Sequence, residues 1–224
     1  MKQLPLDIGL ARAPTLASFL AGPNQAAWKH LQLWVASPTR SPVPTYLWGP
    51  PASGKTHLLK AVQESLREQG ARSGWLDPTL AEPPPFDERW AVVLLDEVHR
   101  YSAVQQHAAF SWFVQAQALQ RGVLAAGAFP PSHLQLREDL RTRLGWGHVF
   151  ELHVLSEPER RAVLRQAADA RGVFLSDEVM DFILHRFSRD LGSLMQLLEH
   201  LDAYALQAQR AVTIPLVKAM LEDE

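Results

Sequence analysis

Eight consecutive residues, Gly49–Thr56, have the spacing G-x-x-x-x-G-K-[ST] that cradles nucleotide phosphates. Glycines let such a loop turn tightly, so that successive backbone N–H groups can converge on an anion. Lys55 would then reach the β- and γ-phosphates, and the Thr56 hydroxyl would take a Mg²⁺ ion. The alternative is a glycine-rich connector with an accidental Lys-Thr pair. We expect the loop to bind ADP or ATP together with Mg²⁺.

Two acids, Asp96 and Glu97, follow an apolar stretch that we expect to be a strand at 90–95. Ligands of open α/β sheets bind outside the carboxyl ends of the strands. Asp96 is predicted to hold Mg²⁺, directly or through water, and Glu97 to orient and activate an attacking water. Acids also end strands for solubility alone, but a phosphate loop earlier in the chain favours the catalytic interpretation.

Alternating strands and helices must hold these residues in place. We expect short apolar strands at 46–48, 90–95, 122–128 and 149–155, and helices at 24–36, 57–69 and 102–120. This alternation predicts a parallel sheet with helices on both faces. The proline-rich stretch 78–85 is expected to be a loop, and the side chains of Gln105, Gln106 and His107 are expected to face solvent.

Only helical patterns remain after residue 155. Ser156 and Glu159 have the spacing of a capping box, which marks the start of a helix. Further helices are expected at about 177–187, at about 190–210 and after Thr213. The chain should therefore close with a helical subdomain.

The composition of the 224 residues limits the classes of protein to consider. Hydrophobic residues make up 47% and charged residues 21%, which is typical of a folded globular chain. The formal net charge of −2 gives no overall attraction to nucleic acid or anionic lipid. The absence of cysteine excludes disulfides and thiolate catalysis. Because no apolar run is long enough for a membrane span and no signal peptide is present, we expect a cytoplasmic protein.

The phosphate loop, the acids, an arginine-containing segment and the helical C-terminal region together resemble an AAA+ ATPase module, and more closely the DnaA family. Phe19, Gly22 and Asn24 are placed like that family's segment before the first helix, and Leu140–Gly147 resembles its arginine-finger box. The resemblance implies an α/β fold, namely a P-loop AAA+ module with a five-stranded parallel sheet covered by helices on both faces, followed by a smaller all-helical lid domain. The implied domains are an N-terminal clamp-binding tail and initial segment at 1–22, a nucleotide-binding α/β domain at 23–155 and the lid at 156–224.

The chain is further similar to the Hda family of regulatory inactivators of DnaA. It ends at Glu224, where DnaA carries a further helix-turn-helix domain, so we expect no direct sequence-specific DNA binding. The segment Gln3-Leu4-Pro5-Leu6 resembles the family's sliding-clamp peptide, although a terminus with an accidental likeness is the alternative. The resemblance implies a nucleotide-bound protein that docks on the DNA-loaded clamp, the β subunit of DNA polymerase III, and stimulates hydrolysis of DnaA-bound ATP. It would thereby negatively regulate the initiation of DNA replication. Whether the protein forms a homo-oligomer is left open.

The resemblance also assigns roles to two arginines. Arg143 takes the finger position and Arg189 the sensor-2 position of the lid, where a planar guanidinium pairs with phosphate oxygens. Either could instead be an ordinary surface arginine. The expected site residues are, as catalytic groups, Glu97 and Arg143; as metal ligands, Thr56 and Asp96; as clamp contacts, Gln3, Leu4, Pro5 and Leu6; and as nucleotide contacts, Gly49, Pro50, Pro51, Ala52, Ser53, Gly54, Lys55, Thr56, His57, Asp96 and Arg189.

One position departs from the family's pattern. Ala128-Phe129 stand where the family usually carries a polar sensor-1 residue and then Arg, and neither side chain can hydrogen-bond a γ-phosphate. Among the histidines, only His99 is expected near the site. Because Ala128 and Phe129 are apolar, we expect this chain to hydrolyse ATP only weakly. Its own nucleotide would be a structural ligand, and catalysis would take place on the ATP of a partner. Two rivals remain: an autonomous ATPase of the helicase-loader type, and a nucleotide-dependent clamp adaptor without finger function.

Overall fold

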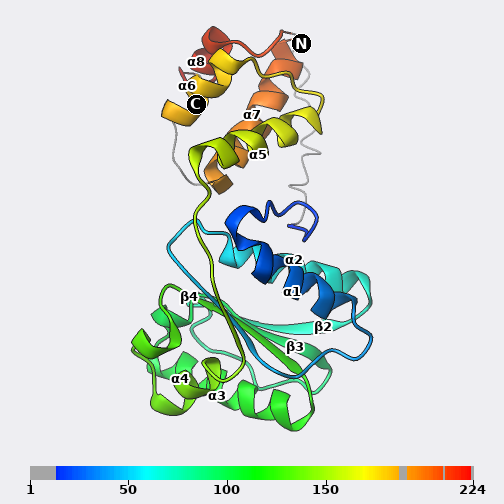
Figure 1. The fold of residues 1–224 in the computed structure, drawn as a ribbon, viewed down its shortest axis with the longest axis vertical. Coiled ribbons are helices and arrows are strands. Elements are labelled where there is room, and N and C mark those ends of the chain that lie inside the picture. Colours follow the sequence, from blue (N-terminus) through cyan, green and yellow to red (C-terminus); the bar gives the residue numbers. More distant parts are fainter. Residues whose placement is uncertain (1–13, 187–190, 209, 223–224) are drawn as a thin grey trace. The chain divides into compact units, whose positions relative to one another are not determined.

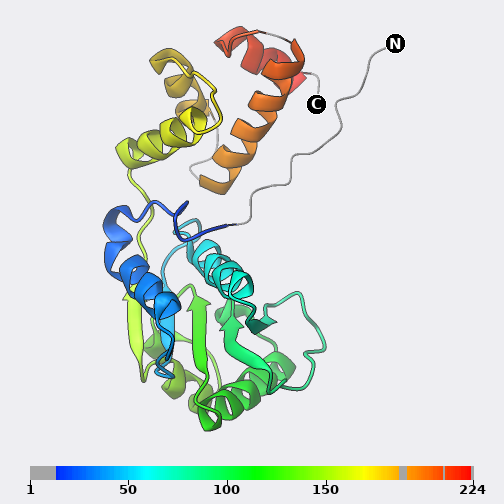
Figure 2. The same ribbon diagram turned by 90° about the vertical axis from the view of Figure 1, so that its right-hand side faces the viewer.

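The computed structural model describes residues 14–186, 191–208 and 210–222, which fall into two compact units, within Ala13–Val154 and Leu155–Glu224. The first unit contains a five-stranded sheet with the order β2-β3-β4-β1-β5. Its strands are β1 (Thr45–Trp48), β2 (Arg72–Leu76), β3 (Trp90–Leu95), β4 (Gly122–Gly127) and β5 (His148–Glu151). Every neighbouring pair is parallel, and Figure 2 shows the strands running in the same direction.

Helices cover both faces of this sheet (Figure 1). One face carries α1 (Gln25–Ala36) and α2 (Lys55–Glu68), and the other carries α3 (Ala103–Ala118) and α4 (Glu138–Leu144). Successive strand side chains point to opposite faces. Accordingly Leu94 of β3 packs in the core on the α1 and α2 side, whereas Leu95 packs on the α3 and α4 side. Short 3₁₀ helices lie at η1 (Gly22–Asn24), η2 (Val98–Arg100) and η3 (Pro131–His133).

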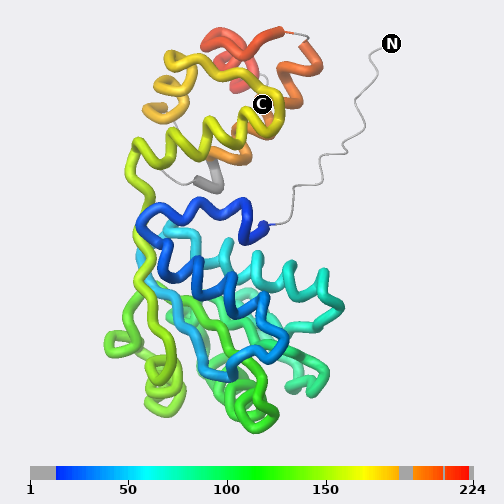
Figure 3. Tube along the Cα trace, turned by 45° about the vertical axis from the view of Figure 1, so that its right-hand side comes forward, coloured from blue at the N-terminus to red at the C-terminus, as the bar shows by residue number. Residues whose placement is uncertain are grey.

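The second unit consists of helices, whose course Figure 3 follows. They are α5 (Glu157–Asp169), α6 (Asp177–Arg186), α7 (Leu191–Ala208) and α8 (Ile214–Glu222). The capping box expected at Ser156 and Glu159 is present at the start of α5. The helices share a core of buried side chains that includes Leu164, Met180, Ile183, Leu201 and Val217. Among the described residues, no helix is long and apolar enough to cross a bilayer.

The architecture confirms the expected five-stranded parallel sheet with helices on both faces and the helical C-terminal region. Strand β2 was not apparent as an apolar run, because this edge strand begins with the exposed Arg72 and contains a serine and a glycine. Strand β5 ends at Glu151, earlier than the expected residue 155. The pattern also did not indicate α4, whose seven residues are too few for a clear helical period.

The expectation that Gln105 faces solvent is wrong. Its side chain is only 3% exposed, whereas Gln106 is half-buried and His107 is exposed. The Gln105 amide donates to the carbonyl oxygens of Pro78 and Leu80, both at 3.0 Å, and its Oε1 accepts from the Ser102 N–H at 2.8 Å. A polar side chain can be buried when its hydrogen bonds are satisfied. Gln105 therefore fixes the loop at 78–85, which is irregular as expected.

Candidate functional site

The carboxyl ends of three adjacent strands bring the predicted phosphate loop and the two acids to one edge of the sheet. Strand β4 lies between β1 and β3 in the sheet order. The loop follows β1, whereas Asp96 and Glu97 follow β3. Because the strands are parallel, these ends meet at the same edge.

Two glycines of the loop occupy positions that no other residue could take without distortion. Gly49 and Gly54 have φ angles of 149° and 92°, a region that L side chains rarely adopt. A Cβ atom on Gly49 would collide with the carbonyl oxygen of Leu152, and one on Gly54 would lie 2.7 Å from the ring of Phe19. Ala52 between them also has a left-handed φ of 63°. Positive φ angles in a loop of this kind help to turn backbone N–H groups toward one concave face.

The N-terminus of α2 has the features of an anion site. Its N-cap residue, Gly54, offers no side-chain cap, and its first turn contains no acidic side chain. Leu58 N–H donates to the Gly54 carbonyl oxygen at 3.0 Å, so the N–H groups of residues 55–57 come before the helical hydrogen-bond pattern begins. Such groups and the helix dipole favour a bound phosphate.

The ammonium group of Lys55 lies within the loop. Its Nζ donates to the carbonyl oxygens of Gly49 at 2.8 Å and Pro50 at 2.7 Å, and to Ser53 Oγ at 3.3 Å. Burial lowers the pKa of Lys55, while the charges of Asp96 and Glu97 act in the opposite direction. The three acceptors are neutral, so the cost of burying the Lys55 charge is only partly offset. A negatively charged phosphate bound nearby would offset it further.

Asp96 and Thr56 lie together, as a divalent cation would need. Asp96 is buried, and its Oδ1 accepts from the Glu97 N–H at 2.9 Å. Burial raises the pKa of Asp96, and hydrogen bonds from Thr56 and Glu97 oppose that rise. No group of three metal-ligating side chains occurs among the described residues. The pair still suits Mg²⁺, which is commonly held by one or two protein oxygens together with phosphate oxygens and water.

Glu97 has an unusual backbone. Its φ of 49° is left-handed, which is uncommon for a residue other than glycine and recurs at functional sites. Its carboxylate pairs with Arg100 at 2.8 Å. The Glu97 side chain is 41% exposed and that of Arg100 is 60% exposed. An exposed pair of this kind contributes at most about 1 kcal/mol. Glu97 can therefore exchange Arg100 for another partner at little cost.

The end of β4 is apolar in its own side chains, as the sequence indicated. Phe129 is 51% exposed, and its carbonyl oxygen accepts a hydrogen bond from the Tyr46 hydroxyl at 2.7 Å. The backbone N–H of Ala128 donates to His99 Nδ1 at 3.2 Å, and the rings of His99 and Phe129 meet edge to face at 6.0 Å. The sequence predicts that His99 lies near the site but does not indicate this contact, since 29 residues separate the partners.

His57 faces the segment before the first helix. Its Nε2 lies 3.3 Å from the carbonyl oxygen of Thr15 and 3.5 Å from Ser18 Oγ, and its ring meets that of Phe19 at 5.6 Å. Burial lowers the pKa of His57. The side chain thus joins α2 to residues 15–19. The backbone N–H of His57, by contrast, lies at the helix N-terminus, where a phosphate would bind.

Arg143 lies in the last turn of α4, and this helix packs on the opposite face of the sheet from α2, which follows the loop. Its guanidinium lies over the rings of Phe110 at 5.4 Å and Phe113 at 5.8 Å. The neighbouring Arg137, by contrast, pairs with Asp139 at 2.7 Å. Within the part of the chain that the structure describes, neither Arg141 nor Arg143 forms an ion pair. Arg143 is therefore held by aromatic faces and has no ion-pair partner among the described residues.

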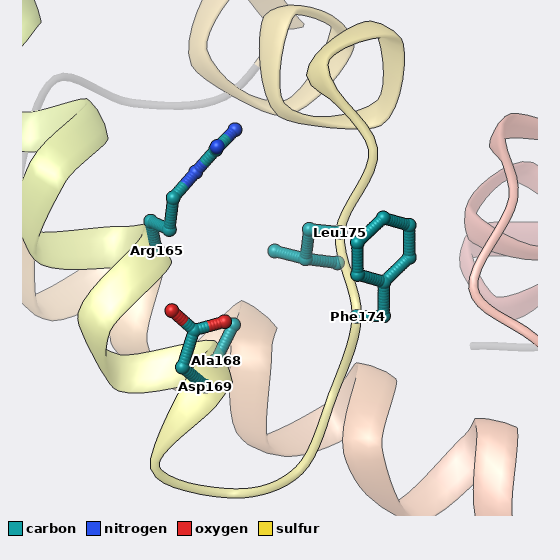
Figure 4. A pocket seen from close by; sticks show the side chains of 5 residues that line it. All are labelled: Arg165, Ala168, Asp169, Phe174 and Leu175. Atoms are coloured by element: carbon teal, nitrogen blue, oxygen red, sulfur yellow. The ribbon is translucent and has the colours of Figure 1, made fainter.

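Other predicted residues do not extend this arrangement. Arg189 and the clamp contacts Gln3, Leu4, Pro5 and Leu6 lie outside the described residues. A hollow of about 140 Å³ lies between α5 and the segment before α6. Figure 4 shows the side chains that line it, which are Arg165, Ala168, Asp169, Phe174 and Leu175. Ligand pockets usually measure roughly 300–1,000 Å³, so this hollow is too small for a nucleotide.

Comparisons with known proteins agree with this arrangement. Residues 157–221 match the model of the Hda lid domain. The chain is 34% identical to an uncharacterized protein of Haemophilus influenzae over 98% of both chains. Two solved structures, each 19% identical, are domain III of the replication initiation protein DnaA from Thermotoga maritima and AMPPCP-bound DnaA from Aquifex aeolicus. The first has a TM-score of 0.75, with 99% of this chain and 98% of the other covered, and the second has 0.68, with 88% and 68% covered.

The two kinds of likeness establish different things. At 19% identity the solved structures show the fold, which is that of an AAA+ module. The lid match and the relative that is similar along its whole length show the family. The chain belongs to the Hda family of DnaA-related AAA+ proteins.

Proposed function

We propose that this protein, with nucleotide bound, docks on the DNA-loaded sliding clamp and stimulates hydrolysis of the ATP bound to DnaA. Initiation of DNA replication is thereby negatively regulated. The observation that carries the proposal is Arg143, an arginine without an ion-pair partner among the described residues, on an AAA+ fold of the Hda family. A free guanidinium offers the planar fork that phosphoryl transfer uses for charge stabilisation.

The chain's own nucleotide is proposed as a structural ligand. ADP or ATP binds through the backbone of Gly49–Gly54 and through Lys55, and Mg²⁺ binds through Thr56 and Asp96. The geometry that supports these roles is the uncapped helix start, the engaged ammonium and the adjacent hydroxyl and carboxylate. Slow turnover is expected because the end of β4 supplies no polar side chain of its own.

Arg143 is proposed to act in trans. Its guanidinium stabilises the negative charge that develops on the phosphoryl group of DnaA-bound ATP, as arginine fingers do in other NTPases. In this proposal residues 23–155 bind nucleotide, residues 156–224 form the lid to which Arg189 belongs, and residues 1–22 contain the clamp peptide Gln3–Leu6. Leu4 and Leu6 serve as apolar anchors, and Pro5 reduces the entropy that the segment loses on binding.

The experiment measures hydrolysis of DnaA-bound ATP with clamp, DNA and this protein present or omitted in turn. The proposal predicts rapid conversion to ADP only when all three are present. Clamp retention without any change in DnaA hydrolysis would instead identify a clamp adaptor, and the finger role would be rejected.

A second candidate, an autonomous ATPase of the helicase-loader type, has support from Asp96 and Glu97, which occupy the end of β3 beside the loop. Its test is turnover of ATP by the isolated protein. Multiple turnovers at a rate that neither clamp nor DnaA alters would favour the autonomous enzyme. A rate well below the clamp-dependent conversion of DnaA-bound ATP is expected if nucleotide is structural.

A further inference from the structure

The end of β4 carries a polar group that belongs to another segment. We propose that His99 donates a hydrogen bond from Nε2 to the terminal phosphate of a nucleoside triphosphate in the loop, so that the site distinguishes a triphosphate from a diphosphate. The inference rests on the proposed nucleotide binding and adds a residue that determines which nucleotide is preferred. His99 would thus provide the polar contact that Ala128 and Phe129 lack.

The position of His99 follows from the sheet. Strand β4 runs between the strand that precedes the phosphate loop and the strand that precedes the acids. A ligand on the loop therefore lies beside the end of β4. His99 belongs to η2, which directly follows Asp96 and Glu97, and the 3.2 Å hydrogen bond from Ala128 N–H fixes its ring at that end.

This hydrogen bond also determines the tautomer. Nδ1 accepts from a backbone N–H, so in a neutral imidazole the proton lies on Nε2 and makes that atom a donor. Burial is the main cause that lowers the pKa of His99, which keeps the ring neutral at pH 7. Among the described residues, Nε2 has no hydrogen-bond partner, and Phe129 packs edge-on against the ring. Nε2 is thus a donor without a partner among these residues, on a ring that the Ala128 hydrogen bond holds in place.

The charges that act on His99 are those of the candidate site. Glu97 and Asp96 raise its pKa, while Lys55 and Arg100 lower it. The imidazole thus lies within electrostatic reach of the ammonium that would face the phosphates. Hydrogen bonds to charged groups are stronger than those between neutral groups, so loss of this donor should weaken triphosphate binding roughly 10- to 100-fold.

The competing explanation is that His99 only holds the end of β4 in place. Two amide variants separate the alternatives. His99→Asn retains an acceptor near the position of Nδ1 for the Ala128 N–H and removes the reach of Nε2. His99→Gln extends an amide toward the position of Nε2. His107→Asn, an exposed histidine on α3, is the matched control.

The measurement is calorimetric titration of the full chain with Mg²⁺-AMPPCP and with Mg²⁺-ADP. For His99→Asn we expect the affinity for AMPPCP to fall roughly 10- to 100-fold relative to that for ADP. His99→Gln should retain part of the difference and His107→Asn all of it. Adding Ala128→Asn to His99→Asn should restore AMPPCP affinity, because a polar side chain then stands at the end of β4.

The outcomes distinguish this inference from the proposed function. If His99→Asn binds both nucleotides with the native ratio of affinities, or loses both equally, His99 is structural and the inference is wrong. If the native protein binds neither nucleotide, the proposed nucleotide site fails and this inference fails with it. A selective loss of AMPPCP in His99→Asn supports it.

Discussion

Two cations of the α/β unit, Lys55 and Arg143, stand in opposite surroundings. Lys55 donates to three oxygen acceptors of its own loop, on the sheet edge that also carries Asp96. Arg143 rests on the rings of Phe110 and Phe113 and forms no ion pair among the described residues. The difference is consistent with our proposal that the loop edge holds a ligand of this chain, whereas Arg143 of α4 acts on the nucleotide of another molecule.

Loss of the α4 arginine should have the greatest effect. Arginine fingers contribute roughly 10³- to 10⁵-fold in rate in other NTPases, so Arg143→Ala should reduce clamp-dependent hydrolysis of DnaA-bound ATP by about this factor. Arg143→Lys should recover little, because lysine lacks the planar fork. The measurement is the rate of conversion of ATP-DnaA to ADP-DnaA.

Arg141→Ala is the matched control for this comparison, since Arg141 is a cation of the same short helix. Its conversion rate should stay close to native, with folding and clamp affinity checked for each variant. Full activity of Arg143→Ala together with failure of Arg141→Ala would mean that the other arginine is the finger. Full activity of both would remove the trans mechanism.

Substitutions in the proposed clamp peptide should abolish docking on the clamp while leaving the roles of Lys55 and Arg143 unaffected. Burial of a leucine side chain contributes about 1.5–3 kcal/mol, so changing Gln3, Leu4 and Leu6 to Ala should abolish retention on clamp-coated beads. Nucleotide binding should remain native, because the loop is untouched. Retention at the native level would show that the clamp contacts lie elsewhere.

Lys55→Ala should remove most of the stabilisation that bound nucleotide gives the protein. A ligand at 100 times its dissociation constant stabilises a protein by about 2.7 kcal/mol, which corresponds to roughly 5–10 °C in melting temperature for a chain of this size. The native protein should show this rise with ADP and Lys55→Ala should show little. Lys60→Ala, on the exposed side of the same helix, serves as the control. An equal rise in the Lys55 variant would contradict the phosphate role.

Asp96→Asn should have a smaller effect than Lys55→Ala. Measured without ligand, it should raise the stability of the protein rather than reduce it. Burial raises the pKa of Asp96 above its unfolded value, so the folded state loses stability as pH rises through the folded pKa. At pH 7 the variant should therefore be more stable than the native protein, and the gain should vanish in acid below the unfolded pKa. Thermal melts without nucleotide at both pH values measure this. Asp169→Asn, on the exposed surface of α5, should change neither melt.

Local patterns in the sequence predict the residues of the loop edge, whereas contacts between residues that are distant in the chain could not be predicted from such patterns. Lys55 and Asp96 were predicted because a phosphate loop and an acid-ended strand are each encoded in a few consecutive residues. The burial of Gln105 depends on carbonyl groups more than 20 residues earlier in the chain. His99 similarly bonds to Ala128, and Arg143 meets aromatic rings of α3. No periodicity in one segment records such partners.

The central claim is that this chain binds one nucleotide and acts on another. Its most direct test loads DnaA with radiolabelled ATP and this protein with unlabelled ADP, then follows the label on clamp-loaded DNA. The account predicts rapid conversion of the label to ADP with the native protein and with Arg141→Ala, and conversion slower by about 10³-fold or more with Arg143→Ala. Equal conversion with Arg143→Ala, or none with the native protein, would contradict it.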